Sequence, residues 1–167
     1  PVYASGFAKS LIENRLKEFG SLDKINLLNI DTTKSIKLKN FVINFISTTH
    51  SIPEPHALEI DTKYGKLLHT ADWKIDSSPT LGKSFDTESL KQIGNNGLLA
   101  LIGDSTNADV PGYSKSEAEV REELVKVFSR YNNRIVITCF SSNIARMESI
   151  AVAAKKNNRK IALVGRS

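Results

Sequence analysis

Apolar and polar residues alternate in short runs over the first 70 positions, and these runs predict one helix followed by several strands. Between Gly6 and Phe19 the apolar residues recur at helical spacing, and Gly20 stands where a helix normally ends. Two of the later apolar runs flank Tyr64-Gly65, which is typical of a β-hairpin. The predicted strands cover residues 25–30, 36–38, 41–46, 57–60 and 66–69. This part of the chain is therefore expected to be α+β with antiparallel strand pairs.

The next 40 residues or so predict a loop, a short helix and a strand. Residues 74–85 contain Pro79, Gly82 and several serines, which indicate a loop. Asp86 can cap a helix that ends at Gly94. The apolar run 98–102 then predicts a buried strand.

The pattern changes after Pro111-Gly112 to alternating helices and strands. Ser114 and Glu117 have the spacing of a capping box ahead of an amphipathic helix. A buried strand at 135–140, a helix at 144–154 and a strand at 160–164 follow, and this order is typical of a right-handed parallel crossover. The fold class is therefore predicted to be α/β, with a boundary between residues 1–112 and 113–167.

Composition and charge exclude several classes of protein. The 167 residues are 40% hydrophobic and 25% charged, which excludes a disordered chain and a disulfide scaffold. The net charge of +5 favours an anionic partner such as nucleic acid, but only weakly. No run reaches the roughly 18 apolar residues that a membrane helix needs, so no membrane partner is expected.

The single cysteine indicates the cellular compartment, and the chain ends indicate whether the protein is longer than this chain. Cys139 lies in an apolar run and is predicted to be buried. One cysteine forms no internal disulfide, which indicates a reducing compartment, and we expect a cytoplasmic protein. The chain starts at Pro1 and stops directly after a predicted strand, so we expect a segment of a longer protein.

Three residues that can bind metals or protons follow predicted strands: His50, Asp72 and Asp104. Imidazole and carboxylate groups are both zinc ligands, and Asp72 follows His50 by 22 positions. Two ligands are too few for a stable zinc site, however, and a histidine or aspartate after a strand is more often a turn or capping residue. Spacing alone therefore leaves a metal site and ordinary turns as alternatives.

Ser141, Ser142 and Asn143 lie between a predicted strand and a predicted helix. Backbone N–H groups and the helix dipole at such a position can bind a phosphate. The same residues are also good helix caps, so phosphate binding and capping both stay open.

Several segments resemble motifs of the ribonuclease J family, which belongs to the β-CASP branch of the metallo-β-lactamase superfamily. Residues 45–54 resemble the third metal-binding motif of that family, and residues 69–76 resemble the fourth. Residues 103–112 resemble the acidic motif that opens the β-CASP region, and residues 138–146 and 164–167 resemble later β-CASP segments. The motifs follow one another in the family's order along the whole chain.

The resemblance implies a zinc-dependent ribonuclease that hydrolyses RNA by exonucleolytic or endonucleolytic cleavage, with two zinc ions in each active site. His50 is then expected to bind one zinc, Asp72 to bridge both, and Asp104 to orient a water or a ligand histidine. Ser141, Ser142 and Asn143 are expected to contact the RNA backbone. The implied fold for residues 1–112 is the C-terminal part of an αββα metallo-β-lactamase section, followed by the start of a parallel α/β β-CASP domain. Homo-oligomers are expected for the full-length protein.

The chain departs from the family in three respects. It has no His-x-His-x-Asp-His motif, so the isolated chain is expected to bind zinc weakly and to be inactive. Ala71 stands where the family usually has glycine, and Ala145 where many members have histidine, so no RNA contact is carried over to Ala145. A DNA or small-molecule hydrolase of the superfamily and a non-catalytic module of the same fold remain alternatives.

Overall fold

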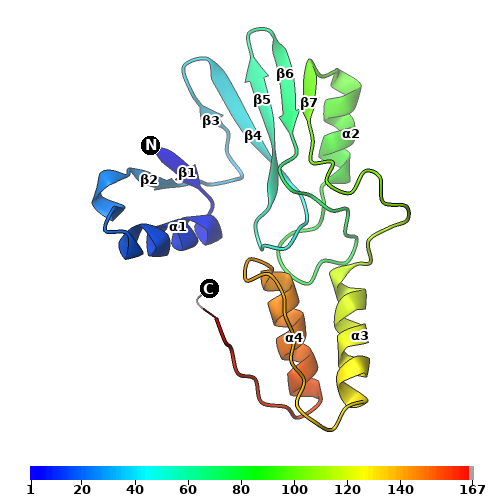
Figure 1. Ribbon diagram of the computed structural model, residues 1–167. Helices are drawn as coiled ribbons and strands as arrows, with labels where there is room; N and C mark the ends of the chain where they lie inside the picture. The colour runs from blue at the N-terminus through cyan, green and yellow to red at the C-terminus, as the bar shows by residue number, and fades with distance from the viewer. Residues whose placement is uncertain (166–167) are drawn as a thin grey trace. The chain divides into compact units, whose positions relative to one another are not determined.

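A computed structural model describes residues 1–165 as a mixed α/β structure with parallel and antiparallel strand pairs (Figure 1). The chain passes several times between two units. The first unit comprises Pro1–Ser47, His56–Ala71 and Asp86–Asp104, and the second comprises Thr48–Pro55, Asp72–Phe85 and the chain from Ser105 onward. The expected β-CASP segment 164–167 lies partly outside the described residues. The predicted boundary after residue 112 stays a prediction.

Five strands of the first unit form one sheet in chain order. They are β3 (Ile36–Lys37), β4 (Phe41–Ser47), β5 (His56–Thr62), β6 (Gly65–His69) and β7 (Ala100–Ile102). Neighbours are antiparallel except β6 and β7, which run parallel. The predicted hairpin at Tyr64-Gly65 is confirmed as the turn between β5 and β6.

Helix α2 (Thr87–Asn96) covers this sheet. Ile93 of α2 is buried against Ile46, Ala57 and Leu68 from three neighbouring strands. Asp86 caps the helix as predicted, because its carboxylate accepts a hydrogen bond from the Ser89 N–H at 3.0 Å. The helix continues past the expected end at Gly94.

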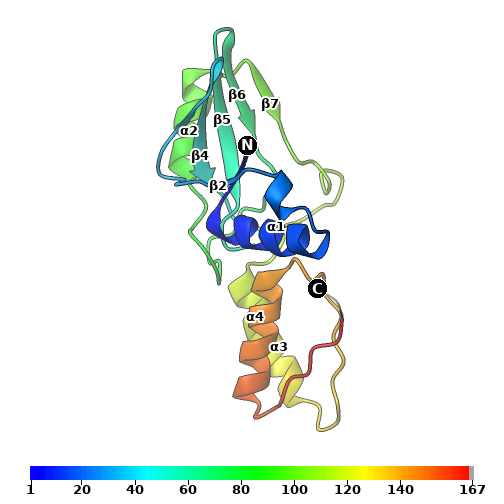
Figure 2. The same ribbon diagram turned by 90° about the vertical axis from the view of Figure 1, so that its left-hand side faces the viewer.

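The N-terminal residues form a separate β–α–β element of the first unit (Figure 2). β1 (Val2–Ala4) pairs in parallel with β2 (Leu27–Asn29), and α1 (Gly6–Glu18) and the short 3-10 helix η1 (Leu22–Lys24) connect them. Gly20 follows α1 with φ of 60°, which confirms the predicted end of this helix.

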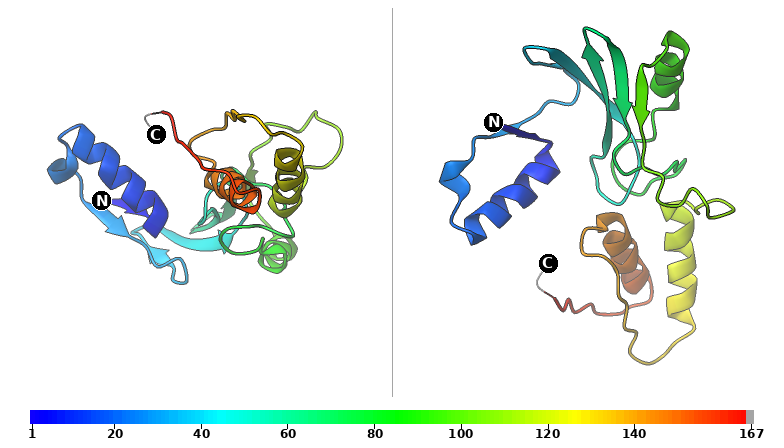
Figure 3. Two further views of the ribbon diagram at one scale, coloured as in Figure 1. Left: turned by 90° about the horizontal axis from the view of Figure 1, so that it is seen from below. Right: turned by 45° about the horizontal axis from the view of Figure 1, so that its top comes forward.

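Two helices, α3 (Glu117–Ser129) and α4 (Ile144–Lys156), form the core of the second unit and lie side by side (Figure 3). Phe128 of α3 packs against Ala153 and Ala154 of α4. The predicted capping box is wrong by two residues, because Ser116 and Glu119 form it. None of the helices within residues 1–165 is long and apolar enough to cross a membrane.

The predicted strands at 135–140 and 160–164 do not form, and within residues 1–165 the parallel crossover is absent. A strand needs a neighbouring strand for its ladder hydrogen bonds, and no described strand pairs with either segment. Both segments are exposed instead: Val136 is 83% exposed and Leu163 82%. Cys139 is consequently exposed rather than buried.

The strand predicted at 98–102 forms only over Ala100–Ile102 and is exposed rather than buried. β7 is the edge strand of its sheet, with β6 as its one neighbour among the described strands. The apolar run therefore predicted a strand correctly, but its predicted burial was wrong.

Candidate functional site

His50 and Asp72 lie in two loops of the second unit that are joined by one threonine. The Thr49 hydroxyl donates a hydrogen bond to the Lys74 carbonyl and accepts one from the Asp76 N–H at 3.1 Å. The Lys74 N–H in turn donates to the Thr49 carbonyl at 2.8 Å. Thr49 is buried, so these bonds are shielded from water. Thr49, the residue before His50, thus ties the loop of His50 to the loop of Asp72.

The side chains of His50 and Asp72 are both exposed. His50 Nδ1 lies 3.1 Å from the Ser51 hydroxyl, and among the described residues the Asp72 carboxylate has no hydrogen-bond or ion-pair partner. An imidazole nitrogen and a carboxylate oxygen suit zinc, so the two donors fit the metal that the resemblance implies. Within residues 1–165, no three His, Cys, Asp or Glu side chains gather closely enough to hold a metal ion. The chain can therefore offer two zinc ligands, and further ligands would have to come from elsewhere.

Asp104 belongs to the first unit and follows β7, as the sequence predicted. Its N–H donates to the Thr70 hydroxyl at 3.0 Å, and the Thr70 N–H donates to the Ile102 carbonyl at 3.0 Å. Because β6 and β7 run parallel, their carboxyl ends meet at one edge of the sheet. Thr70 thereby fixes Asp104 to the segment that leads to Asp72.

The backbone between β6 and Asp72 turns through a left-handed residue. Ala71 has φ of 51°, a conformation that favours glycine. The Ala71 N–H donates to His69 Nδ1 at 3.1 Å, which holds the turn in place. His69 thus has a structural role in this turn.

We expect Ala71→Gly to raise the free energy of unfolding by about 0.5 kcal/mol, since glycine relieves left-handed strain of roughly 1 kcal/mol but adds entropy to the unfolded chain. Urea titration followed by circular dichroism measures the change. The control is Ala151→Gly at an exposed position of α4, which should lower stability by about 1 kcal/mol. Destabilisation by both substitutions would show that the turn at Ala71 is not left-handed.

Asp76 is a buried carboxylate that the sequence did not single out. It is 4% exposed and accepts hydrogen bonds from the N–H groups of Glu117 at 2.8 Å and Ser78 at 2.9 Å. The Lys74 ammonium lies 3.4 Å from it. Since Glu117 is the first residue of α3, Asp76 places its negative charge at the positive end of that helix. The loop of Asp72 therefore caps α3 from 41 residues away along the chain.

Burial by itself would raise the pKa of Asp76, because an apolar environment disfavours the charged carboxylate. The N–H groups of Glu117 and Ser78 and the Lys74 ammonium outweigh this effect, so the pKa of Asp76 lies below its ordinary value. The carboxylate is thus ionised at neutral pH.

The N-terminal turns of α3 and α4 are joined by an ion pair and anchored to the loop of His50. The Glu117 carboxylate accepts hydrogen bonds from Arg146 Nε at 3.0 Å and from its terminal nitrogen at 3.2 Å. This pairing raises the pKa of Arg146 above its ordinary value. The buried Ala145 donates its N–H to the Ser51 carbonyl at 3.2 Å. Both loops that carry candidate ligands thus rest on helix N-termini of the same unit.

Ser141, Ser142 and Asn143 precede α4 in the second unit. The Asn143 side chain caps the helix by accepting a hydrogen bond from the Arg146 N–H at 2.9 Å. Ser141 and Ser142 are exposed. Capping therefore occupies the asparagine, while the two serine side chains face solvent.

Comparison with known proteins first identifies a class. Residues 132–167 match the sequence model of a family described as "Ribonuclease J, beta-CASP domain". A crystal structure of a protein of unknown function from Enterococcus faecalis V583 matches with a TM-score of 0.65 and 16% identity, over 94% of this chain and 43% of that one. At this identity the match shows a shared fold alone.

Comparison with individual relatives gives a more specific identification than the family model and the shared fold. The chain is 40% identical to Ribonuclease J of Synechocystis over 99% of its length, and 41% identical to Ribonuclease J of Sinorhizobium meliloti over 100%. It is 36% identical to Ribonuclease J2 of Bacillus subtilis over 100% of its length. The chain spans 26–30% of the length of these relatives. The resemblance to the ribonuclease J family that the motifs predicted is thus confirmed along the whole chain.

Proposed function

We propose that this chain is a segment of a zinc-dependent ribonuclease. Residues 1–112 form the C-terminal part of its first metallo-β-lactamase section, and residues 113–167 begin its β-CASP domain. The similarity to proteins named Ribonuclease J over the whole chain supports the activity. The observation that carries the proposal is the bonding of Thr49 to Lys74 and Asp76, which joins the loop of His50 to the loop of Asp72. RNA is the substrate of the whole protein, and its compartment is the cytoplasm.

The chain's own residues have distinct tasks in this proposal. His50 would hold one zinc ion, and Asp72 would hold both. When bound, zinc supplies Lewis acidity that lowers the pKa of water and polarises a phosphate. Asp104 orients a water or a ligand histidine by a hydrogen bond. The exposed carboxylate of Asp72 and the fixed backbone of Asp104 support these roles.

In this proposal the turn before α4 contacts the RNA backbone. Ser141 and Ser142 are exposed beside the N-terminus of a 13-residue helix, where N–H groups and the helix dipole favour an anion. Asn143 contributes by capping the helix and thereby fixing the turn.

We expect Asp72→Ala in the whole protein to remove at least one zinc ion per active site and to reduce RNA hydrolysis by more than 100-fold, because a bridging carboxylate holds both ions. Metal content is measured by mass spectrometry, and hydrolysis with a labelled oligonucleotide. The control is Asp23→Ala, an exposed carboxylate of η1, which should leave both unchanged. Retention of both zinc and activity by Asp72→Ala would refute the assignment.

The isolated chain should bind zinc weakly, because two protein ligands are too few for a stable site. Two zinc ions held tightly by these 167 residues would contradict the proposal that other parts of the protein complete the site.

A further inference from the structure

We propose that a groove between two β-turns of the five-stranded sheet binds single-stranded RNA. The groove has a volume of about 590 Å³ and lies between the β3–β4 turn and the β5–β6 turn. It belongs to the first unit and uses none of the residues proposed to bind zinc or the RNA backbone. The choice of RNA rests on the proposed function. The groove would be an additional contact for the substrate.

The groove carries an excess of positive charge. Lys39 from one turn and Lys63 from the other line it, and neither has an acidic partner among the described residues. Asp61 also lines the groove; its carboxylate lies 3.1 Å from the Lys66 ammonium, which is shared with the Glu59 carboxylate at 2.7 Å. Two lysines and one aspartate therefore line the groove, and this excess of positive charge suits a chain of phosphates.

Two aromatic rings accompany these charges. Tyr64 and Phe41 both line the groove and are 76% and 45% exposed. The Lys63 ammonium lies 4.7 Å from the centre of the Tyr64 ring. Exposed rings next to lysines are the combination that binds single strands, because bases stack on the rings while phosphates pair with the cations.

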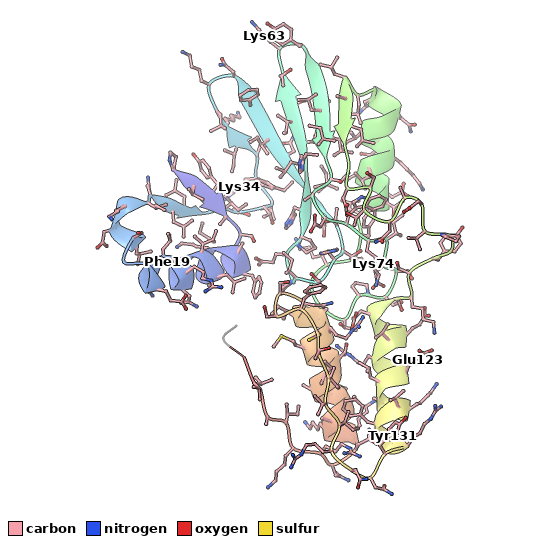
Figure 4. The ribbon with its side chains drawn as sticks, in the orientation of Figure 1. Phe19, Lys34, Lys63, Lys74, Glu123 and Tyr131 are labelled. Atoms are coloured by element: carbon pink, nitrogen blue, oxygen red, sulfur yellow. The ribbon has the colours of Figure 1, made fainter. Side chains whose placement is uncertain are left out.

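The turn that presents Lys63 and Tyr64 is held in one conformation. The Thr62 hydroxyl accepts a hydrogen bond from the Tyr64 N–H at 3.1 Å and donates one to the Gly65 carbonyl at 2.8 Å. Gly65 has φ of 141°, and a Cβ there would lie 3.2 Å from Leu99 Cβ. Figure 4 shows Lys63 at the tip of the β5–β6 hairpin. Little ordering of the backbone is therefore needed when a ligand binds.

A single strand fits these features better than an acidic protein segment does. Lysines alone would attract either polymer, but stacking on Tyr64 and Phe41 requires unpaired bases. Asn40 adds a side-chain amide to the groove, which can donate to and accept from a base edge.

The test measures binding of a fluorescein-labelled 12-nucleotide uridine oligomer to this chain by fluorescence anisotropy in EDTA, so that no metal contributes. We expect the double variant Lys39→Glu/Lys63→Glu to weaken binding at least tenfold. Its slope of log affinity against log salt should be smaller by about 1.4, since each lost phosphate contact to a single strand removes about 0.7. Tyr64→Ala should weaken binding about fivefold and leave the salt slope unchanged.

The matched control is Lys17→Glu/Lys24→Glu, which makes the same charge change at exposed lysines of α1 and η1 that have no acidic partner among the described residues. Circular dichroism verifies that all variants fold. Equal losses in both double variants would overturn the proposal, because only overall charge would then matter. Equal competition by a poly-glutamate peptide of the same length, or no RNA binding by the chain, would overturn it too. None of these three outcomes touches the zinc assignment, which Asp72→Ala tests separately.

Discussion

Replacing Asp76 by alanine is expected to lower the free energy of unfolding by about 3 kcal/mol. The substitution leaves the N–H groups of Glu117 and Ser78 without an acceptor and the Lys74 ammonium without its partner. Hydrogen bonds to a charged group contribute about 1.5–3 kcal/mol each, and the buried position shields them from water. Urea titration followed by circular dichroism measures the loss.

Two further variants make this prediction specific. Asp76→Asn keeps one acceptor oxygen but not the charge. Its free energy of unfolding should therefore lie between that of the wild type and that of Asp76→Ala. Asp23→Ala removes an exposed carboxylate of η1 and should leave stability unchanged. Equal stability of wild type and Asp76→Ala would show that Asp76 does not cap α3 in solution.

The contribution of Asp76 should also depend on pH. Its pKa is lower in the folded chain than in the unfolded chain, so the folded state binds its proton less tightly. The stabilisation is therefore complete above the ordinary carboxyl pKa of about 4 and is lost as the pH falls through the lower folded value. The difference in unfolding free energy between wild type and Asp76→Ala should be constant from pH 6 to about pH 5 and shrink below about pH 4. A difference that grows on acidification would contradict the lowered pKa.

Gly82→Ala is the second substitution with a large expected effect, a loss of about 3 kcal/mol. Gly82 has φ of 75°, and a Cβ on it would lie 2.1 Å from the Pro53 carbonyl oxygen. That contact is with backbone, so the loop of His50 would have to move away from the loop of Asp72, and left-handed strain in alanine adds to the loss. Chemical denaturation measures the stability, and the NMR signals of the His50 ring report movement of its loop.

Gly94→Ala is the matched control for this experiment. Gly94 lies inside α2, its φ is not positive, and a Cβ there meets nothing within 4 Å. Alanine should therefore stabilise the helix by about 0.5–1 kcal/mol. If Gly82→Ala were also neutral or stabilising, the two loops would not approach each other as closely as the structure has them.

Local patterns predicted the elements whose hydrogen bonds are made within a few residues of the chain. Helix α1 ends at Glu18, close to the predicted Gly20, and α4 covers the predicted helix after Ser141 to Asn143. The hairpin at Tyr64-Gly65 was also predicted, because its turn chemistry is local. The same reasoning failed at Ser114, since Ser114 and Ser116 offer the same capping spacing; the helix starts after Ser116, where Glu117 is bonded to the distant Asp76 and Arg146.

The predictions that failed most clearly concern segments whose partners lie far along the chain. The apolar runs at 135–140 and 160–164 have strand propensity, but propensity does not supply a neighbouring strand. The importance of Asp76 was missed for the related reason that its main partner, the Glu117 N–H, is 41 residues away. An aspartate four residues after Asp72 is the one local signal, and it does not reveal a helix N-terminus as its partner.

By itself, the sequence determined the family resemblance, the hairpin, the main helices and the strand-end positions of His50, Asp72 and Asp104. These depend on residue identity and on periodicity over short stretches. The tertiary structure alone decided that Thr49 joins the two loops of the candidate metal ligands, that Asp76 caps α3, and that Lys39 and Tyr64 line one groove. The physical reason is that each of these contacts links residues distant in the chain, and burial and pairing at such distances follow from the packing of the whole unit.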